Sequence, residues 1–222
     1  MGTLYLVRHG QASLGAADYD QLSPLGTRQC HALGEYLAER GLQFETVLRG
    51  TLQRQVQSLA ALSAGHGQLP AVQEWPALDE YDGQALVRAL HSGPAPDAST
   101  PEGYREHFRL LRTGLQAWMA GATLPDGMPP YADWLAGITA ALDHVRSRHR
   151  GDVLMVSSGG PIANIVGQVL GAPPASIIEL NLRIRNSSIT ELAFTRGRYA
   201  LLAYNQVPHL DSAARRAWVT YS

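Results

Sequence analysis

Residues 3–10 read TLYLVRHG, in which five mostly apolar, β-favouring residues run directly into Arg8, His9 and Gly10. A short apolar run of this kind is typical of a central strand that is buried on both faces. Residues 153–161, VLMVSSGGP, repeat the pattern, because four apolar residues end in serine, glycine and proline ahead of a helical segment. Two buried strands that end in polar residues predict an α/β protein with its functional groups at the carboxyl ends of a parallel sheet.

The segments between and after these strands predict further elements. Ser23 and Pro24 begin a helical pattern that ends at Gly41. Residues 46–48 predict a second strand, after which Thr51 predicts the N-cap of another helix. The last third of the chain predicts three more strands, the final two joined as a hairpin, at residues 178–182, 189–194 and 199–204.

Residues 84–150 differ from the rest of the chain. They carry long helical patterns separated by loops rich in proline and glycine at residues 92–101 and 121–130, and no strand pattern. We therefore expect a three-layer α/β/α sandwich with a mostly parallel central sheet. Residues 84–150 would form a helical insertion, or lid, over the carboxyl ends of the strands within a single domain spanning residues 1–222.

The composition restricts the classes of function. The chain has 222 residues, 45% of them hydrophobic, and 18 Lys and Arg against 19 Asp and Glu, for a net charge of −1. This balance argues against nucleic acid or an anionic membrane as a partner. No apolar run is long enough to span a membrane and the first residues resemble no signal peptide, so we expect a cytoplasmic protein. Cys30, the only cysteine, is expected as a buried helix residue.

Three basic groups can meet at the carboxyl ends of the strands. Arg8 presents a planar fork of donors that matches phosphate, and a neutral imidazole at His9 can attack phosphorus. Arg54 lies in the first turn of the helix after the second strand and could reach the same edge. This combination predicts phosphoryl transfer through histidine, although Arg8 and His9 taken alone fit a structural pair equally well.

The order of motifs along the chain resembles the histidine phosphatase superfamily, also called phosphoglycerate mutase-like. The resemblance covers residues 3–210. It is carried by residues 4–10, 22–26, Gln29, Arg54, Glu80, 156–161, Asn186, Ser188 and Ile189.

The resemblance implies a role for each matching residue. His9 would be the nucleophile that becomes phosphorylated, and Arg8 and Arg54 would hold the phosphoryl oxygens. Glu80 would protonate the leaving oxygen and later activate water. Asp79 and Asp82 flank Glu80, so a solvated acidic loop or a cation site remains the alternative interpretation of this segment. We expect no cofactor and no metal.

One position departs from the family pattern. Ser158 stands where the family's second catalytic histidine follows the strand. A serine hydroxyl can donate one hydrogen bond to a phosphoryl oxygen but carries no charge. Losing one such donor typically costs about 100- to 1,000-fold in rate, so we expect a slowed enzyme in which Ser158 and Gly159, with the Gly160 amide, bind the phosphate.

The sequence therefore predicts a metal-independent phosphomonoester hydrolase that acts on a small phosphorylated substrate. A phosphate-binding pseudophosphatase without turnover is the main alternative. A phosphoglycerate mutase fits less well, because Gln11, Ala12 and Gly15 replace the residues that mutases use to recognise substrate. The oligomeric state stays open, with a homodimer as one option.

Residues 102–134 offer two further groups of side chains. Arg105, Arg109 and Arg112 could form a basic rim, but Glu102 and Glu106 lie three residues ahead of the first two and favour pairing within the helix. The aromatic residues are expected mainly as core, with one or two available to line a substrate pocket. They are Tyr81, Tyr104, Phe108, Trp118, Tyr131 and Trp134.

Overall fold

The central sheet is built on the two apolar segments that end in polar residues. The computed structural model describes residues 1–13, 20–91, 93, 96–97 and 100–221, and over these residues the sheet has six strands in the order β3-β2-β4-β1-β5-β6. The strands are β1 (Gly2–Arg8), β2 (Thr46–Arg49), β3 (Val72–Glu74), β4 (Val153–Ser157), β5 (Ile189–Phe194) and β6 (Tyr199–Gln206).

The strand directions bring the two polar strand ends together. The pairs β3-β2, β2-β4 and β4-β1 are parallel, while β5 pairs antiparallel with β1 and β6 antiparallel with β5. In the β1-β4 register Arg8 lies opposite Ser157, so His9 and Ser158 leave the sheet side by side. The mostly parallel sheet and the β5-β6 hairpin are confirmed.

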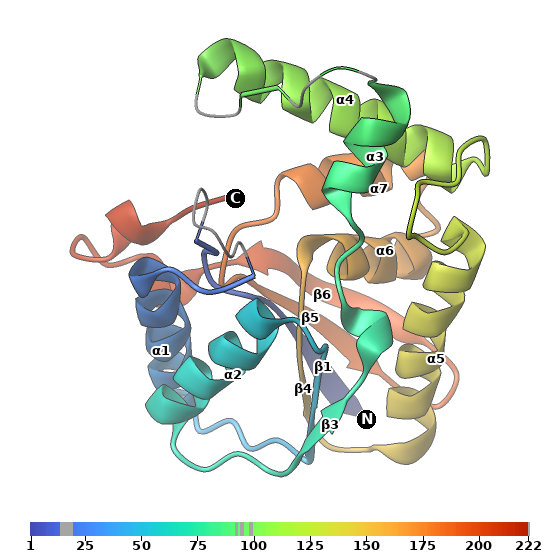
Figure 1. The fold of residues 1–222 in the computed structure, drawn as a ribbon. Helices are drawn as coiled ribbons and strands as arrows, with labels where there is room; N and C mark the ends of the chain where they lie inside the picture. The colour runs from blue at the N-terminus through green and yellow to red at the C-terminus, as the bar shows by residue number, and fades with distance from the viewer. Residues whose placement is uncertain (14–19, 92, 94–95, 98–99, 222) are drawn as a thin grey trace.

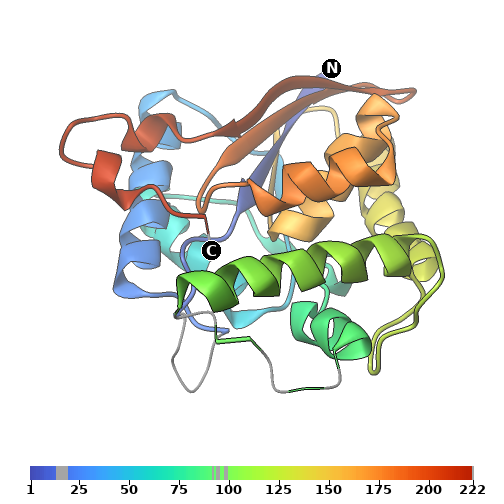
Figure 2. The same cartoon turned by 90° about the horizontal axis from the view of Figure 1, so that it is seen from above.

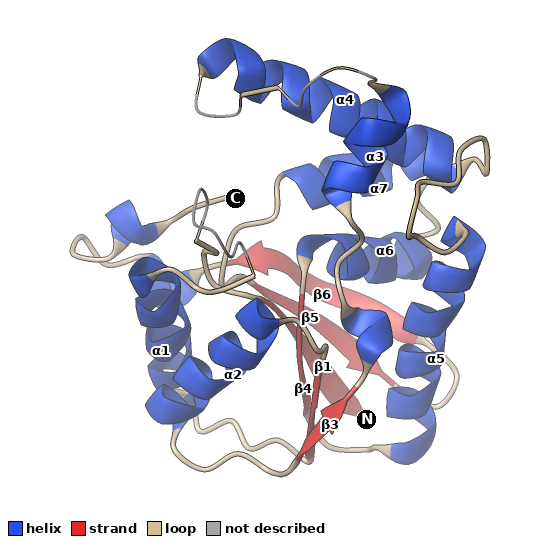
Figure 3. Cartoon of the chain, viewed as in Figure 1, coloured by secondary structure: helices blue, strands red, loops and turns tan. Residues whose placement is uncertain are grey.

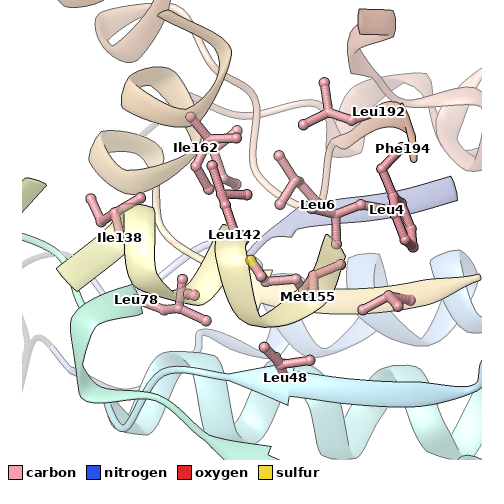
Figure 4. Close-up of a cluster of buried hydrophobic side chains, with 14 of the residues drawn as sticks. Leu4, Leu6, Leu48, Leu78, Ile138, Leu142, Met155, Ile162, Leu192 and Phe194 are labelled. Atoms are coloured by element: carbon pink, nitrogen blue, oxygen red, sulfur yellow. The ribbon is translucent and has the colours of Figure 1, made fainter. Parts of the chain in front are cut away.

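Helices cover both faces of this sheet (Figures 1 and 3). The helices of the described residues are α1 (Pro24–Glu39), α2 (Gln53–His66), α3 (Gly83–Leu90), α4 (Pro101–Met119), α5 (Tyr131–Arg148), α6 (Gly159–Leu170) and α7 (Pro174–Leu182). Because side chains alternate along a strand, Tyr5 and Val7 pack with α1 and α2, whereas Leu4 and Leu6 pack with α5 and α6. Figure 4 shows the second of these clusters, where Ile138 and Leu142 of α5 meet β1 and β4. The result is the expected three-layer α/β/α sandwich.

The segment expected as one insertion is divided between two places. α3 and α4 lie beyond the carboxyl end of the sheet, where α4 runs alongside α7 (Figures 1 and 2). Their apolar faces pack around Trp118 and Leu86 in a separate cluster. α5, in contrast, belongs to the sandwich, because its buried side chains pack directly on the sheet.

Two local predictions are wrong. Residues 178–182 form part of helix α7 instead of a strand, since Pro173 and Pro174 begin a helix there and Ile177 packs against Gly167 of α6. A short apolar run does not by itself distinguish a strand from a buried helix. Thr51 is not the N-cap of α2, which begins after Leu52, because the Thr51 hydroxyl bonds the Asp79 carboxylate instead.

The predicted helix that follows Ser23 is confirmed as α1. The Ser23 hydroxyl accepts a hydrogen bond from the Gly26 amide, and Gly41 lies just beyond the helix with a φ of 67°. Cys30 is buried in this helix as expected, and burial raises the pKa of its thiol to about 11. Among the described residues, no helix is long and apolar enough to cross a membrane.

Replacing Gly34 with alanine is expected to lower the free energy of unfolding by about 1–3 kcal/mol. Gly34 lies where α1 crosses α2, and a Cβ there would stand 2.1 Å from the Leu62 carbonyl oxygen. Urea denaturation measures the change. Gly197→Ala is the matched control, because a Cβ at Gly197 meets no atom within 4 Å. Equal stability of the two variants would contradict this account of the α1-α2 contact.

Candidate functional site

His9 is held from both sides at the end of β1. Its amide donates to the Ser157 carbonyl at 2.9 Å, and its carbonyl accepts from the Ser187 amide at 3.1 Å. The residue is only 3% exposed. His209 braces the turn behind it, with Nε2 and the Ser187 hydroxyl 2.9 Å apart. The imidazole at position 9 therefore has a fixed position at the carboxyl edge of the sheet.

The hydrogen bonding of His9 assigns its tautomer. Nδ1 lies 2.7 Å from the Gly10 carbonyl oxygen, which can only accept, so Nδ1 carries the hydrogen and Nε2 keeps its lone pair. Burial, and then the nearby charges of Arg8 and Arg54, hold the pKa of His9 well below its ordinary value. His9 is therefore a neutral imidazole at neutral pH, as a nitrogen nucleophile must be.

The two predicted arginines flank this imidazole, and both are buried. Nη1 of Arg8 donates to the carbonyl oxygens of Ile184, at 2.5 Å, and of Tyr221, at 3.3 Å. Nη1 of Arg54 donates to the Asp20 carboxylate at 2.7 Å. The structure thus brings Arg8 and Arg54 together with His9 at one place.

Glu80 faces the beginning of α6. Both of its carboxyl oxygens lie 3.1 Å from the Gly160 amide nitrogen, which donates to them. Gly160 permits this approach, because a Cβ there would stand 2.1 Å from Oε1 of Glu80. The prediction that the Gly160 amide is free to hold a phosphoryl oxygen is therefore wrong for this structure.

Burial raises the pKa of Glu80 above its ordinary value, while the Gly160 bond and the charges of Arg54 and Arg8 act in the opposite direction. A carboxyl group with a raised pKa stays protonated to higher pH, as a general acid must. Glu80 therefore lies within electrostatic reach of both arginines with properties suited to donating a proton.

The other two carboxylates of this segment bind backbone amides: Asp79 binds those in the loop before α2, and Asp82 binds those of α3 as its N-cap. Asp79 accepts from the Thr51 amide at 2.6 Å and the Leu52 amide at 3.2 Å, at the beginning of α2. Asp82 is the N-cap of α3 and accepts from two amides of its first turn. No group of three or more His, Cys, Asp or Glu side chains able to hold a metal occurs in the described part of the chain. Asp79, Glu80 and Asp82 thus each bind a different part of the backbone.

Ser158 contacts Gln55, a residue that the sequence pattern did not single out. Ser158 is fully buried, and its Oγ lies 2.9 Å from Nε2 of Gln55, which is also fully buried. Gln55 follows Arg54 in the first turn of α2, so one turn of helix supplies both side chains. In the sequence, Gln55 is marked only by its position next to Arg54. That position does not show which way its side chain points.

The remaining candidate groups that the structure describes pair or pack with other side chains. Arg105 and Arg109 pair with Glu102 and Glu106 within α4, as predicted, and Arg112 pairs with Glu179 of α7. The large aromatic side chains mostly pack around Trp118, which is core. The Gln11 side chain accepts from the Ser23 hydroxyl at 2.8 Å, and Gly15 lies outside the described residues.

Solved structures of low sequence identity share this fold. A phosphoserine phosphatase mutant from Entamoeba histolytica, in complex with phosphoserine, is 17% identical, with a TM-score of 0.66 over 95% of this chain and 100% of that one. YhfR from Bacillus stearothermophilus is 17% identical, with a TM-score of 0.68 over 94% and 99% of the two chains. A mycobacterial glucosyl-3-phosphoglycerate phosphatase, in complex with VO3, is 23% identical, with a TM-score of 0.63 over 92% and 99%.

Among curated proteins, a sequence search finds no match. The family model described as the histidine phosphatase superfamily (branch 1) matches residues 4–207. This range contains His9, both arginines, Glu80 and Ser158. The chain therefore belongs to the histidine phosphatase superfamily.

Proposed function

We propose that the protein is a metal-independent phosphomonoester hydrolase that works through a phosphohistidine at His9. The observation that carries the proposal is the His9 tautomer, because Nδ1 donates to the Gly10 carbonyl and leaves the Nε2 lone pair available to attack. Its substrate would be a small phosphorylated molecule. We place the reaction in the cytoplasm, where a buried free thiol such as Cys30 stays reduced.

The first half of the reaction moves the phosphoryl group to His9. Nε2 attacks phosphorus, the phosphorus–oxygen bond to the leaving group breaks, and Glu80 gives its proton to the departing oxygen. Arg8 and Arg54 balance the negative charge of the phosphoryl oxygens. Ser158 adds a neutral hydrogen-bond donor. Gly159 lies at the beginning of α6, where a Cβ would stand 3.7 Å from Nε of Arg8.

The second half of the reaction releases phosphate. The Glu80 carboxylate accepts a proton from water, the water oxygen attacks phosphorus, and the phosphorus–nitrogen bond breaks. His9 returns to the neutral form that its surroundings favour, and Glu80 is protonated again. No proton or charge is gained or lost by the protein over the cycle.

A phosphate-binding pseudophosphatase remains a second candidate because of Ser158. This position supplies no positive charge, so the described cationic side chains within reach of His9 are Arg8 and Arg54. The same arginines can bind a phosphorylated ligand without turnover. The two candidates differ in whether a covalent intermediate forms.

Trapping the intermediate tests the proposal. The protein is mixed with an activated aryl phosphate in excess chelator and quenched in alkali, and the modified peptide is mapped by mass spectrometry. We expect phosphate on His9 in an adduct that acid removes, as expected of a phosphorus–nitrogen bond. Turnover that requires an added divalent cation, or an acid-stable adduct elsewhere, would overturn the mechanism. Phosphate binding with no adduct and no turnover would favour the pseudophosphatase.

A further inference from the structure

The Gln55 side chain has only one orientation that satisfies its surroundings. Nε2 lies 3.0 Å from the Leu78 carbonyl oxygen and 2.9 Å from Oγ of Ser158. A carbonyl oxygen can only accept, so the amide group must present its nitrogen to Leu78. Its two hydrogens then go to Leu78 and Ser158, and the Ser158 oxygen acts as an acceptor.

This arrangement leaves the hydroxyl hydrogen of Ser158 for another acceptor. The described residues provide none, since the Gln55 contact is the one hydrogen bond of this hydroxyl among them. Ser158 follows directly on Ser157, whose carbonyl accepts from the His9 amide at 2.9 Å. The hydroxyl of Ser158 therefore has an unused donor, on the residue that follows the backbone contact to His9.

The surroundings of Gln55 show that it is held in place at a cost. Oε1 of Gln55 is buried and has no hydrogen-bond partner among the described residues, which lowers stability. Gly50 makes room for it, because a Cβ at Gly50 would stand 2.0 Å from Oε1. An apolar side chain of similar length would fill this space without burying an unpaired carbonyl group.

We propose that Gln55 is a positioning residue that orients the Ser158 hydroxyl to donate a hydrogen bond to the transferring phosphoryl group. The inference rests on the proposed function. It assigns Gln55 and Ser158 to one unit, in which Gln55 occupies the acceptor side of the hydroxyl and Ser158 contacts the substrate. The unit adds a donor to the site without adding a charge or a group that titrates near neutral pH.

The test compares wild type with Gln55→Met, Ser158→Ala and the double variant, using an aryl phosphate. We expect each single variant to lower kcat about 100-fold with little change in KM. The double variant should lose no more than Ser158→Ala alone, because Gln55 acts through Ser158. Ser158→Thr, which keeps a hydroxyl, should retain most of the rate.

Gln57→Met is the matched control. Gln57 lies two residues further along α2, and its Oε1 accepts from the Leu22 amide at 2.8 Å, away from Ser158. Its loss should lower the melting temperature and leave kcat unchanged. Should Gln55→Met fail to fold, Gln55→Asn replaces it, because the shorter side chain keeps an amide but draws its nitrogen back from Oγ of Ser158.

Orthovanadate binding, followed by calorimetry, separates this inference from the proposed function. If wild type shows no His9-dependent turnover, the proposed function fails, and vanadate affinity still reports whether Gln55 and Ser158 act as one unit. Equal, non-additive losses of affinity would support the unit. Additive losses in kcat or in vanadate affinity, or a Ser158→Ala protein that behaves as wild type in both, would overturn it.

Discussion

His9→Ala is expected to lower kcat for an activated aryl phosphate by at least about 10⁴-fold, because no nucleophile remains to form the covalent intermediate. The variant removes the one side chain whose lone pair is presented by the Nδ1 contact to Gly10. Phosphate affinity should survive, since Arg8 and Arg54 remain. Release of phosphate in excess chelator measures the rate, and calorimetry measures the binding.

The matched control is a histidine at the last residue of α2, at the opposite end of that helix from Arg54. His66→Ala removes a ring whose Nε2 lies 3.0 Å from the Leu42 carbonyl oxygen, and it should leave His9-dependent turnover in place. Both variants are checked for folding by circular dichroism. A His9→Ala protein that hydrolyses the ester at the wild-type rate would show that another group attacks phosphorus.

Glu80→Gln should affect substrates unequally. For an alkyl phosphate, whose leaving oxygen needs a proton, we expect kcat to fall by about 10²- to 10⁴-fold. For a nitrophenyl phosphate, whose leaving group departs as a stable anion, the fall should be much smaller. Glutamine keeps the size of the side chain and its contact with the Gly160 amide, so the difference isolates the proton. Equal losses for both substrates would contradict the acid role.

Turnover should depend on pH through both Glu80 and His9. Glu80 acts while protonated, so alkyl-phosphate turnover should be lost as pH rises through its raised pKa. His9 acts while neutral, so turnover should be lost as pH falls through its lowered pKa, below the ordinary range of histidine. The alkaline loss should be absent from Glu80→Gln. A wild-type alkaline limb that persists unchanged in the variant would assign it to another group.

The raised pKa of Glu80 also affects the stability of the fold. A carboxyl group whose pKa is raised by folding contributes stability that is present below its unfolded value and lost as pH rises through the folded value. Glu80→Gln should therefore be more stable than wild type at neutral pH. Glu45→Gln is the opposite control, because backbone amides of Arg150 and Gly151 lower the pKa of Glu45 to about 2. Removing that carboxylate should reduce stability at neutral pH and leave activity unchanged.

Every strand except β3, and the long helices, could be predicted because local pattern decides them. The apolar segments that became β1 and β4 are buried on both faces, and Ser23, Pro24 and Gly41 mark the ends of α1. Residues 178–182 show the limit of this reasoning. Their apolar pattern fits a strand as well as a helix, and the packing of Ile177 on Gly167 is a contact between distant elements. The strand β3 could not be predicted, because three residues are too few to carry a local pattern.

The sequence by itself determined the fold class and the family and named the candidate site residues, because these depend on residue types and their order along the chain. Only the tertiary structure decided how those residues are arranged. In the structure Glu80 accepts a hydrogen bond from the Gly160 amide, whereas Asp79 and Asp82 bind other amides. Gln55 donates to the Ser158 hydroxyl. Hydrogen bonds such as these join residues far apart in the chain. Their geometry depends on how β1, α2, β4 and α6 meet at one edge of the sheet, which no local pattern encodes.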